Sequence, residues 1–257
     1  MTTLQHSAYF ALRELRNLAR QPWYIAFSLG QPIIYLLLFT QLFKRVVEIP
    51  GFAAGSYLDF LAPGIVIMTA LFTAGWGGMG VIVDLDKGVM DRFLVTPVSR
   101  VALITGRLVQ LAVVIVIQSL IIIVLAKLLG ATFPGGVAGM AALIGSAILL
   151  ALPFGAMSIG IALLARKEES MIGAVQFVLL PLTFLSSVFM AQNLMPSWMQ
   201  EAAKFNPVNW AVEAARGALS LQVDWSMVLT RMGWLFGLGV IFAWFATAAF
   251  RSYQRSA

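Results

Sequence analysis

The sequence has no cysteine and only one histidine, His6, which lies close to its N-terminus. Without cysteine the chain cannot form a disulfide, a thiolate zinc site or a Cys/His catalytic dyad. It also lacks any Gly-Lys dipeptide, so the phosphate-binding loop GxxxxGK[ST] cannot occur in it. We therefore expect this chain to have no catalytic residue, no metal site and no bound cofactor.

Charged residues are scarce as well. They make up 11% of the 257 residues, whereas 60% are hydrophobic, and the mean hydropathy is +0.90. A soluble domain of this length could not hide so much apolar surface, but a lipid bilayer is a suitable solvent for it. The apolar runs are continuous, without the alternation that is typical of barrel strands. These features predict an all-α, polytopic membrane protein.

Six apolar segments come close to or exceed the roughly 20 residues that a helix needs to cross a bilayer. They are Tyr24–Phe43, Phe60–Val83, Thr105–Ala126, Val137–Ala165, Met171–Ala191 and Met232–Phe250. The segment 4–20 has apolar residues on one helical face and arginines on the other, which predicts an amphipathic helix on the membrane surface. Prolines interrupt the segment 192–231, which predicts short external helices at, or re-entering, the membrane. The chain 1–257 is expected to form a single membrane domain.

The basic residues predict the orientation of these spans. With both termini in the cytoplasm, the 17 Lys and Arg residues divide into eleven inside and six outside, which is the bias expected of cytoplasmic loops. Topology therefore explains the net charge of +6. The basic residues form no cluster, and we expect no nucleic-acid partner.

Away from their ends, the predicted spans contain no Asp, Glu, Lys or Arg. Carriers driven by proton or ion gradients usually hold such residues in the membrane, because coupling needs a group that changes charge there. If ATP supplies the energy instead, a partner subunit must hydrolyse it, since this chain has no phosphate-binding loop.

Glycine strings occur inside the apolar segments. Gly75–Gly80 matches the dinucleotide fingerprint GxGxxG, but no strand precedes it, so close helix packing or bending is the better interpretation. The same interpretation applies to two GxxxG pairs, Gly135/Gly139 and Gly233/Gly237.

The segment 84–100, between the second and third spans, combines both signs of charge with apolar residues at helical spacing. Thr96 and Pro97 are typical of a helix start, here the start of the third span. A short surface helix of this composition, carrying Phe93, would suit docking of another protein. The alternative is a simple connecting loop.

This loop resembles the segment that follows the second helix of ABC-2-type transporter permeases. The matching residues are Asp86, Lys87, Gly88, Asp91, Arg92, Leu94, Thr96, Pro97, Val98, Ser99 and Arg100. Phe184–Phe189, Leu194–Trp198, Asn206, Pro207 and Arg216 are similar, in the same order, to the fifth span and external connector of the family. The most similar subgroup is the bacterial daunorubicin-resistance-type drug exporters.

The resemblance implies a membrane subunit that works with a separate ATP-binding cassette subunit, which would hold ATP and Mg. Two permease chains, expected to be identical, and two ATPase chains would form an exporter in the bacterial inner membrane. A drug-like or lipophilic compound would cross between the two permeases. The residues implied in ATPase contact are Asp86, Lys87, Gly88, Asp91, Arg92, Phe93, Leu94, Pro97 and Arg100.

Polar and aromatic residues of the first and fifth spans are candidates for the substrate path, although hydrogen bonds between helices would explain most of the polar ones. The path candidates are Gln31, Gln176, Phe184, Ser186, Ser187 and Phe189. On the external connector the candidates are Trp198, Asn206, Pro207, Glu213 and Arg216. Trp198 would anchor at the interface, and Glu213 would pair with Arg216 at spacing i, i+3. Polysaccharide or lipid-linked glycan export, an ion-coupled carrier and a non-transport scaffold are the alternatives.

Overall fold

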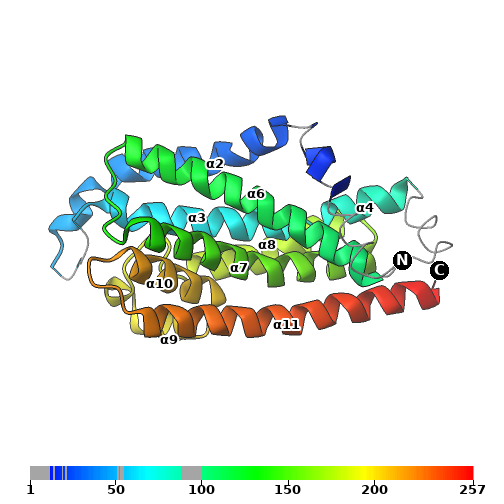
Figure 1. Ribbon diagram of the computed structural model, residues 1–257. Coiled ribbons are helices and arrows are strands. Elements are labelled where there is room, and N and C mark those ends of the chain that lie inside the picture. Colours follow the sequence, from blue (N-terminus) through cyan, green and yellow to red (C-terminus); the bar gives the residue numbers. More distant parts are fainter. Residues whose placement is uncertain are drawn as a thin grey trace.

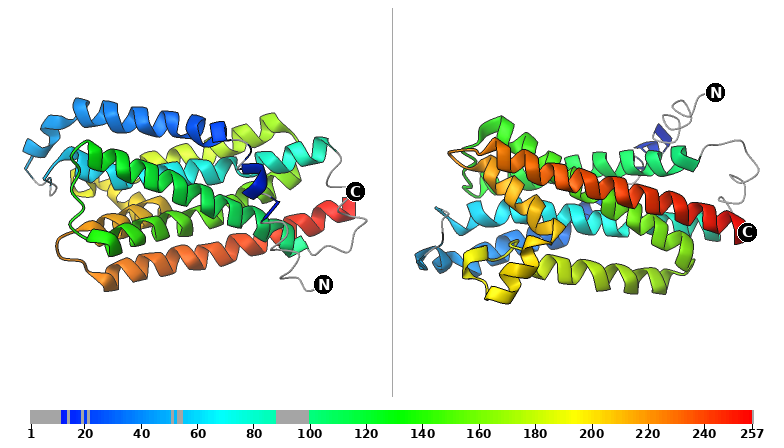
Figure 2. Two further views of the ribbon diagram at one scale, coloured as in Figure 1. Left: turned by 45° about the horizontal axis from the view of Figure 1, so that its top comes forward. Right: turned by 90° about the horizontal axis from the view of Figure 1, so that it is seen from below.

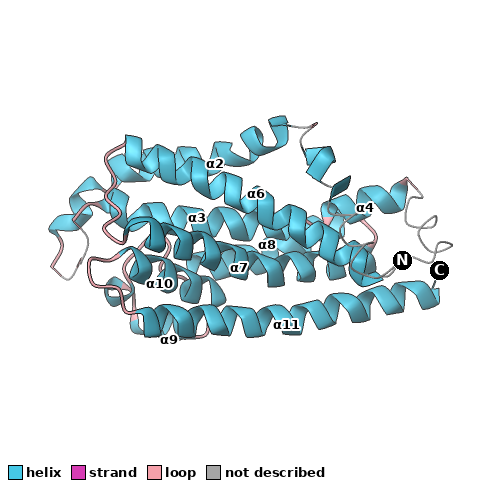
Figure 3. Cartoon of the chain, viewed as in Figure 1, coloured by secondary structure: helices cyan, strands magenta, loops and turns pink. Residues whose placement is uncertain are grey.

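The computed structural model describes residues 12–13, 15–18, 20, 22–50, 52, 55–87 and 100–256. Throughout these residues the secondary structure is helical, without a strand, which confirms the all-α prediction (Figure 3). The long helices run back and forth along one direction, so the bundle has two ends (Figure 1). We name them the α4 end and the α10 end, after helices α4 (Met79–Asp86) and α10 (Pro207–Leu219).

Six longer helices form the body of the bundle. They are α2 (Pro22–Leu42), α3 (Tyr57–Trp76), α6 (Arg100–Leu128), α7 (Gly136–Ala165), α8 (Glu168–Phe184) and α11 (Trp225–Ser256). The remaining short elements are η1 (Lys44–Glu48), η2 (Gln192–Leu194) and α9 (Ser197–Lys204). In Figure 1, η1 and α9 lie at the α10 end, whereas the C-terminal end of α11 lies at the α4 end.

The core lies along α3 and α7, which pack against each other in the middle of the bundle. The fully buried side chains include Leu61, Ile65 and Leu71 of α3 and Leu143 and Leu150 of α7. Helices α2 and α11 lie on opposite sides of this pair, as Figure 1 and the left view of Figure 2 show. Their outer faces expose large apolar side chains such as Phe27, Phe236 and Trp244, a distribution that suits lipid rather than water.

Five stretches of helix are long and apolar enough to cross a membrane: Ile25–Leu42, Tyr57–Asp86, Thr105–Leu128, Gly136–Ala165 and Trp225–Ala248. They support the predicted spans one, two, three, four and six. The fifth predicted span, Met171–Ala191, differs. Its helix α8 has 17 residues and ends at Phe184, seven residues before the predicted end, which places it near the lower limit for a crossing helix.

The long helices begin earlier than the hydropathy predicted, and for two of them a polar side chain caps the start. Ser56 Oγ accepts a hydrogen bond from the Asp59 backbone N–H (3.0 Å), so α3 starts at Tyr57. Asp224 Oδ1 accepts from the backbone N–H of Ser226 (3.0 Å), so α11 starts at Trp225. Asp59 and Arg231 therefore lie inside the outer turns of long helices and not in the connecting segments.

The two GxxxG pairs differ in their surroundings. A Cβ atom on Gly135 or Gly139 would lie 2.1 or 2.3 Å from the carbonyl oxygen of Ala218, so only glycine allows α10 to approach α7 this closely. No atom lies within 4 Å of the corresponding positions on Gly233 and Gly237. Close helix packing within this chain therefore explains the pair Gly135/Gly139 but not the pair Gly233/Gly237.

Candidate functional site

Helices α3 and α4 are separated by a break at Gly77 and Gly78, inside the span that the sequence predicts as continuous. Ser158 of α7 bridges the break, because its hydroxyl accepts from the Gly78 N–H (2.8 Å) and donates to the Gly75 carbonyl. A Cβ atom on Gly78 would lie 2.3 Å from the Ser158 carbonyl oxygen. The glycine string therefore serves close packing and a bend, as predicted for it.

An ion pair joins α4 to α6. Nη2 of Arg107 pairs with Asp84 and also donates to the Gly80 carbonyl oxygen (3.2 Å). A Cβ atom on Gly80 would lie 2.7 Å from Nη1 of Arg107, so a larger residue there would push the guanidinium away. Since α4 precedes the predicted docking loop and α6 follows it, this pair holds together the two helices that enter and leave the loop.

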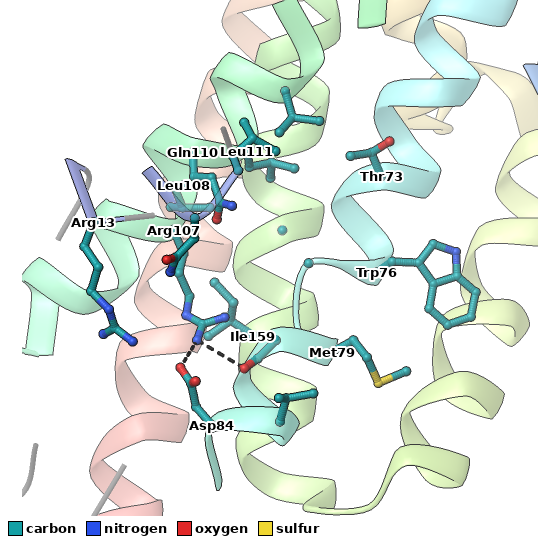
Figure 4. A pocket seen from close by; sticks show the side chains of 17 residues that line it. Arg13, Thr73, Trp76, Met79, Asp84, Arg107, Leu108, Gln110, Leu111 and Ile159 are labelled. Carbon is teal, nitrogen blue, oxygen red and sulfur yellow. Dashed lines mark hydrogen bonds and ion pairs between the residues drawn. The ribbon is translucent and has the colours of Figure 1, made fainter. Parts of the chain in front are cut away.

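A cavity of about 500 Å³ adjoins this ion pair (Figure 4). Its lining comes from the helical residues near Arg13, from the α3–α4 break, from α6 and from α7. The lining combines charged and polar side chains, such as Asp84, Arg107 and Gln110, with apolar ones, such as Leu108, Leu111, Val114 and Ile159. A volume of this size is typical of pockets that hold small molecules.

The predicted docking loop begins at this end of the bundle. Asp86 is the last residue of α4, Lys87 follows it, and both are exposed. Arg100 is the first residue of α6. The other predicted docking residues, Gly88, Asp91, Arg92, Phe93, Leu94 and Pro97, lie outside the described residues, so their role stays a prediction.

At the opposite end, α8 stops in a turn that is buried among α3, α10 and the end of α2. Backbone groups at membrane depth must find partners within the protein, and the turn finds them in side chains. The Ser187 N–H donates to Asn209 Oδ1 (3.1 Å), and the Phe189 carbonyl accepts from the Tyr57 hydroxyl (2.9 Å). These contacts supply partners for two of the backbone groups that the early end of the helix exposes.

Asn206 has two roles at this turn. Its Oδ1 accepts from the Val208 N–H (2.9 Å), which caps α10, and Pro207 occupies the first helical position, where a missing N–H costs nothing. Its Nδ2 donates to the carbonyls of Leu182 (2.7 Å) and Leu185 (3.1 Å). The Asn206-Pro207 pair therefore starts one helix and satisfies the end of another.

Arg216 connects α10 to α3 and to the turn that follows α8. Its Nε donates to the Phe60 carbonyl and its Nη2 to the Val188 carbonyl, each at 3.1 Å, while its guanidinium carbon lies 3.5 Å from the centre of the Phe60 ring. Glu213 pairs instead with Arg231 of α11 (2.8 Å) and accepts from Asn209 (2.8 Å). The predicted Glu213–Arg216 ion pair does not form, because each of these side chains is engaged with other partners.

The candidate path residues divide between surface and interior. Gln31 and Phe184 are exposed, on α2 and α8, and Gln31 Nε2 donates to the Tyr35 hydroxyl (3.0 Å). Ser186 and Ser187 are buried within the turn. Phe189 packs edge-to-face with Phe39 of α2, with ring centres 5.3 Å apart.

Two other candidates lie at the surface of the bundle. Gln176 is half-buried on α8, and Trp198 of α9 is exposed, as expected of an interface anchor. The structure therefore gathers Phe184, Ser186, Ser187, Phe189, Asn206 and Arg216 around one turn, and whether the path candidates touch a substrate stays a prediction.

Sequence reasoning missed Asp84, Arg107, Ser158, Tyr57 and Asn209 as key contacts. Asp84 and Arg107 were assigned to the loop and the third span, and no local signal pairs residues 23 positions apart. In the sequence alone, nothing distinguishes Ser158, Tyr57 and Asn209 from other residues of predicted helices. Asn209 could have been suspected from its position one helical turn before Glu213.

Comparisons with known proteins give a consistent family. The family described as ABC-2 type transporter matches residues 8–220, well over half of the chain. The "Daunorubicin resistance ABC transporter permease protein DrrB1" of Streptomyces coeruleorubidus is 30% identical over 189 residues, which cover 72% of this chain and 64% of that protein. The match thus spans slightly less than two thirds of that relative.

Other relatives agree. The "Putative transport permease ycf38" of Cyanophora paradoxa is 29% identical over 78% of this chain and 69% of its own length. The "Probable doxorubicin resistance ABC transporter permease protein DrrC" of Mycobacterium tuberculosis is 24% identical over 82% of this chain and 76% of its own length. With an all-helical membrane bundle and the matching loop and connector residues, the chain belongs to the ABC-2 type transporter family.

Proposed function

We propose that this chain is the membrane-spanning subunit of an exporter that moves a drug-like or lipophilic compound out of the cell, driven by ATP hydrolysed on a separate subunit. The family match over residues 8–220 carries this proposal, and the names of two relatives, both drug-resistance permeases, support drug-like cargo. The lack of a phosphate-binding loop in the chain is consistent with a separate ATPase.

The segment 86–97 is the proposed contact with the ATP-binding cassette subunit. Asp86 and Lys87 are exposed at the α4 end, and the Asp84–Arg107 pair holds the helices on both sides of the segment. A displacement of the loop would therefore move α4 and α6 together. The exposed outer faces of α2 and α8 would meet a second permease chain or lipid.

The contact can be tested by co-expressing the chain with a candidate ATP-binding cassette subunit from the same genome. We expect the two to copurify, and the triple variant D91A/R92A/F93A to abolish copurification and ATP-dependent uptake of daunorubicin into inverted membrane vesicles. The matched control is K44A/R45A/V46A, which changes two charges and one apolar residue at the α10 end. Stable association of the loop variant with the ATPase would contradict the assignment.

Orientation is part of the proposal, with both termini and the α4 end in the cytoplasm of a bacterial cell. Because the chain has no cysteine, single cysteines report on the two ends without background. A membrane-impermeant maleimide should label Lys44→Cys in intact cells, and Lys87→Cys only after permeabilisation. The reverse labelling pattern would refute the orientation while leaving family membership unaffected.

A further inference from the structure

Three polar side chains connect α2, α3 and α6 inside the membrane-spanning part of the bundle. Gln118 of α6 is only 1% exposed. Its Nε2 donates to Ser28 Oγ of α2 (2.7 Å), and its Oε1 accepts from the Thr73 hydroxyl of α3 (3.0 Å). Gln118 lies near the middle of the apolar stretch Thr105–Leu128, where lipid offers no competing hydrogen-bond partner. The amide therefore joins α2 to both neighbouring helices.

This amide lies between two cavities. The first is the cavity of about 500 Å³ at the α4 end (Figure 4), and its last lining residue on α6 is Val114, one helical turn before Gln118. The second, of about 240 Å³, is lined by residues of α2 and α3, including Ser28. Thr73 and Trp76 line both cavities. The Ser28–Gln118–Thr73 hydrogen bonds thus cross the place where the two cavities meet.

The two cavities lead to different parts of the bundle. The first lies beside the Asp84–Arg107 pair at the α4 end, which the proposed function places in the cytoplasm. The second extends along α3 to Met68, toward the α10 end, and reaches the surface of α2 at the exposed side chains of Phe27 and Gln31. Together they outline a passage from the cytoplasmic end to a face of α2 that is a candidate for the cargo path.

The hydrogen bonds of Gln118 are of a kind that opens readily. Hydrogen bonds between uncharged side chains of membrane helices contribute little to stability, because the separated groups find other partners. Ser28 Oγ already donates to the Ile25 carbonyl (2.8 Å). Thr69 shows the alternative for Thr73, since the Thr69 hydroxyl donates to the backbone carbonyl four residues earlier (2.7 Å). Release of the amide therefore leaves neither hydroxyl without a partner.

Helix α2 has few other buried contacts. Of its side chains that the structure describes, those that are buried are Leu29, Pro32 and Leu36. A helix with so little buried surface is among the elements that move most easily in a packed bundle. The contact of Ser28 with Gln118 is therefore a point at which α2 can separate from α6.

We propose that Gln118 is a gate residue on the route of the cargo. The Ser28–Gln118–Thr73 hydrogen bonds close the passage between the two cavities, and cargo passes when α2 separates from α6 at this point. The inference rests on the proposed function, because it assigns a gate within an exporter. If the amide only fastened three static helices, a permanent link between α2 and α6 would have no effect on transport.

A reversible cross-link tests this difference. Because the chain has no cysteine, Ser28→Cys/Gln118→Cys carries its only two thiols, which a short bifunctional methanethiosulfonate can join. We expect the link to abolish ATP-dependent daunorubicin uptake into inverted membrane vesicles that contain the ATPase subunit, and dithiothreitol to restore it. Ser28→Cys/Thr73→Cys links α2 to α3 with Gln118 in place and should lose uptake in the same way.

Two variants serve as controls. Ile25→Cys/Ser28→Cys places both thiols on α2, so the same reagent ties no helices together and uptake should continue. This pair also reports any damage that the reagent does to the ATPase. Gln118→Leu breaks both hydrogen bonds without linking the helices, and it should still transport daunorubicin and copurify with the ATPase.

Three results would overturn the gate. They are continued uptake after α2 is linked to α6 or α3, loss of uptake in the linked control pair, or loss of uptake in Gln118→Leu that still copurifies. In the last case the amide itself is needed for transport. If the unaltered chain with the ATPase takes up no daunorubicin, the proposed function fails for this cargo and the gate fails with it. Normal uptake by the unaltered chain and by the linked pairs alike refutes the gate alone.

Discussion

Replacement of Arg216 by methionine tests whether this side chain holds α10 in the bundle. Methionine keeps an unbranched apolar stem but lacks the guanidinium, so it removes the donors to the Phe60 and Val188 carbonyls, both at 3.1 Å, and the contact with the Phe60 ring. A hydrogen bond from a charged donor contributes about 1.5–3 kcal/mol, and a cation–π contact about 0.5–2 kcal/mol.

At the lower end of those ranges the loss is about 3.5 kcal/mol. Removing a charge that is costly to desolvate offsets part of this loss, so we expect Arg216→Met to lower the free energy of unfolding by about 2–3 kcal/mol. For a chain of this size that corresponds to a fall in melting temperature of about 5–10 °C. The seven tryptophans allow unfolding in detergent to be followed by intrinsic fluorescence.

Arg231→Met is the matched control at the same end of the bundle. Arg231 pairs with Glu213, but their side chains are 24% and 23% exposed, and the Trp234 ring centre lies 4.4 Å from the guanidinium carbon. A partly exposed pair of this kind contributes about 1 kcal/mol or less. If Arg216→Met unfolds at the same temperature as Arg231→Met, Arg216 does not fasten α10 to α3 and the α8 turn.

Three further substitutions, the first with a control variant, probe the two ends of the bundle. Gly78→Ala should lower the free energy of unfolding by about 1–3 kcal/mol, because its Cβ would overlap the Ser158 carbonyl oxygen. Its control is Gly173→Ala on α8, which has open space around it and should be neutral or slightly stabilising in the same melting assay. Asn206→Ala should lower the free energy of unfolding by about 2 kcal/mol, because it removes the cap of α10 and leaves the carbonyls of Leu182 and Leu185 without this donor. An unchanged melting temperature would show that Asn206 does not stabilise both helix ends. Asp84→Asn should uncouple ATP hydrolysis from daunorubicin transport in vesicles while leaving copurification with the ATPase intact; normal transport would show that the Asp84–Arg107 pair is not needed for coupling.

The membrane architecture follows from local properties of the sequence. The length of each apolar run is set by bilayer thickness, so the spans could be placed without knowing how the helices pack. The Asn206-Pro207 start of α10 was recognisable for a similar reason, since a cap and a first-turn proline act within a few residues. The charged loop 84–100 was recognisable because it interrupts the apolar runs and resembles one family.

The contacts of the two ends were decided only by tertiary structure. Arg216 reaches a carbonyl 156 residues away in the sequence, and Ser158 bridges a helix break 80 residues before it. Such pairings depend on which helices pack together, and no local spacing contains that information. The early end of α8 has the same origin, because an apolar sequence continues as helix unless side chains from other elements satisfy the backbone groups that the turn exposes.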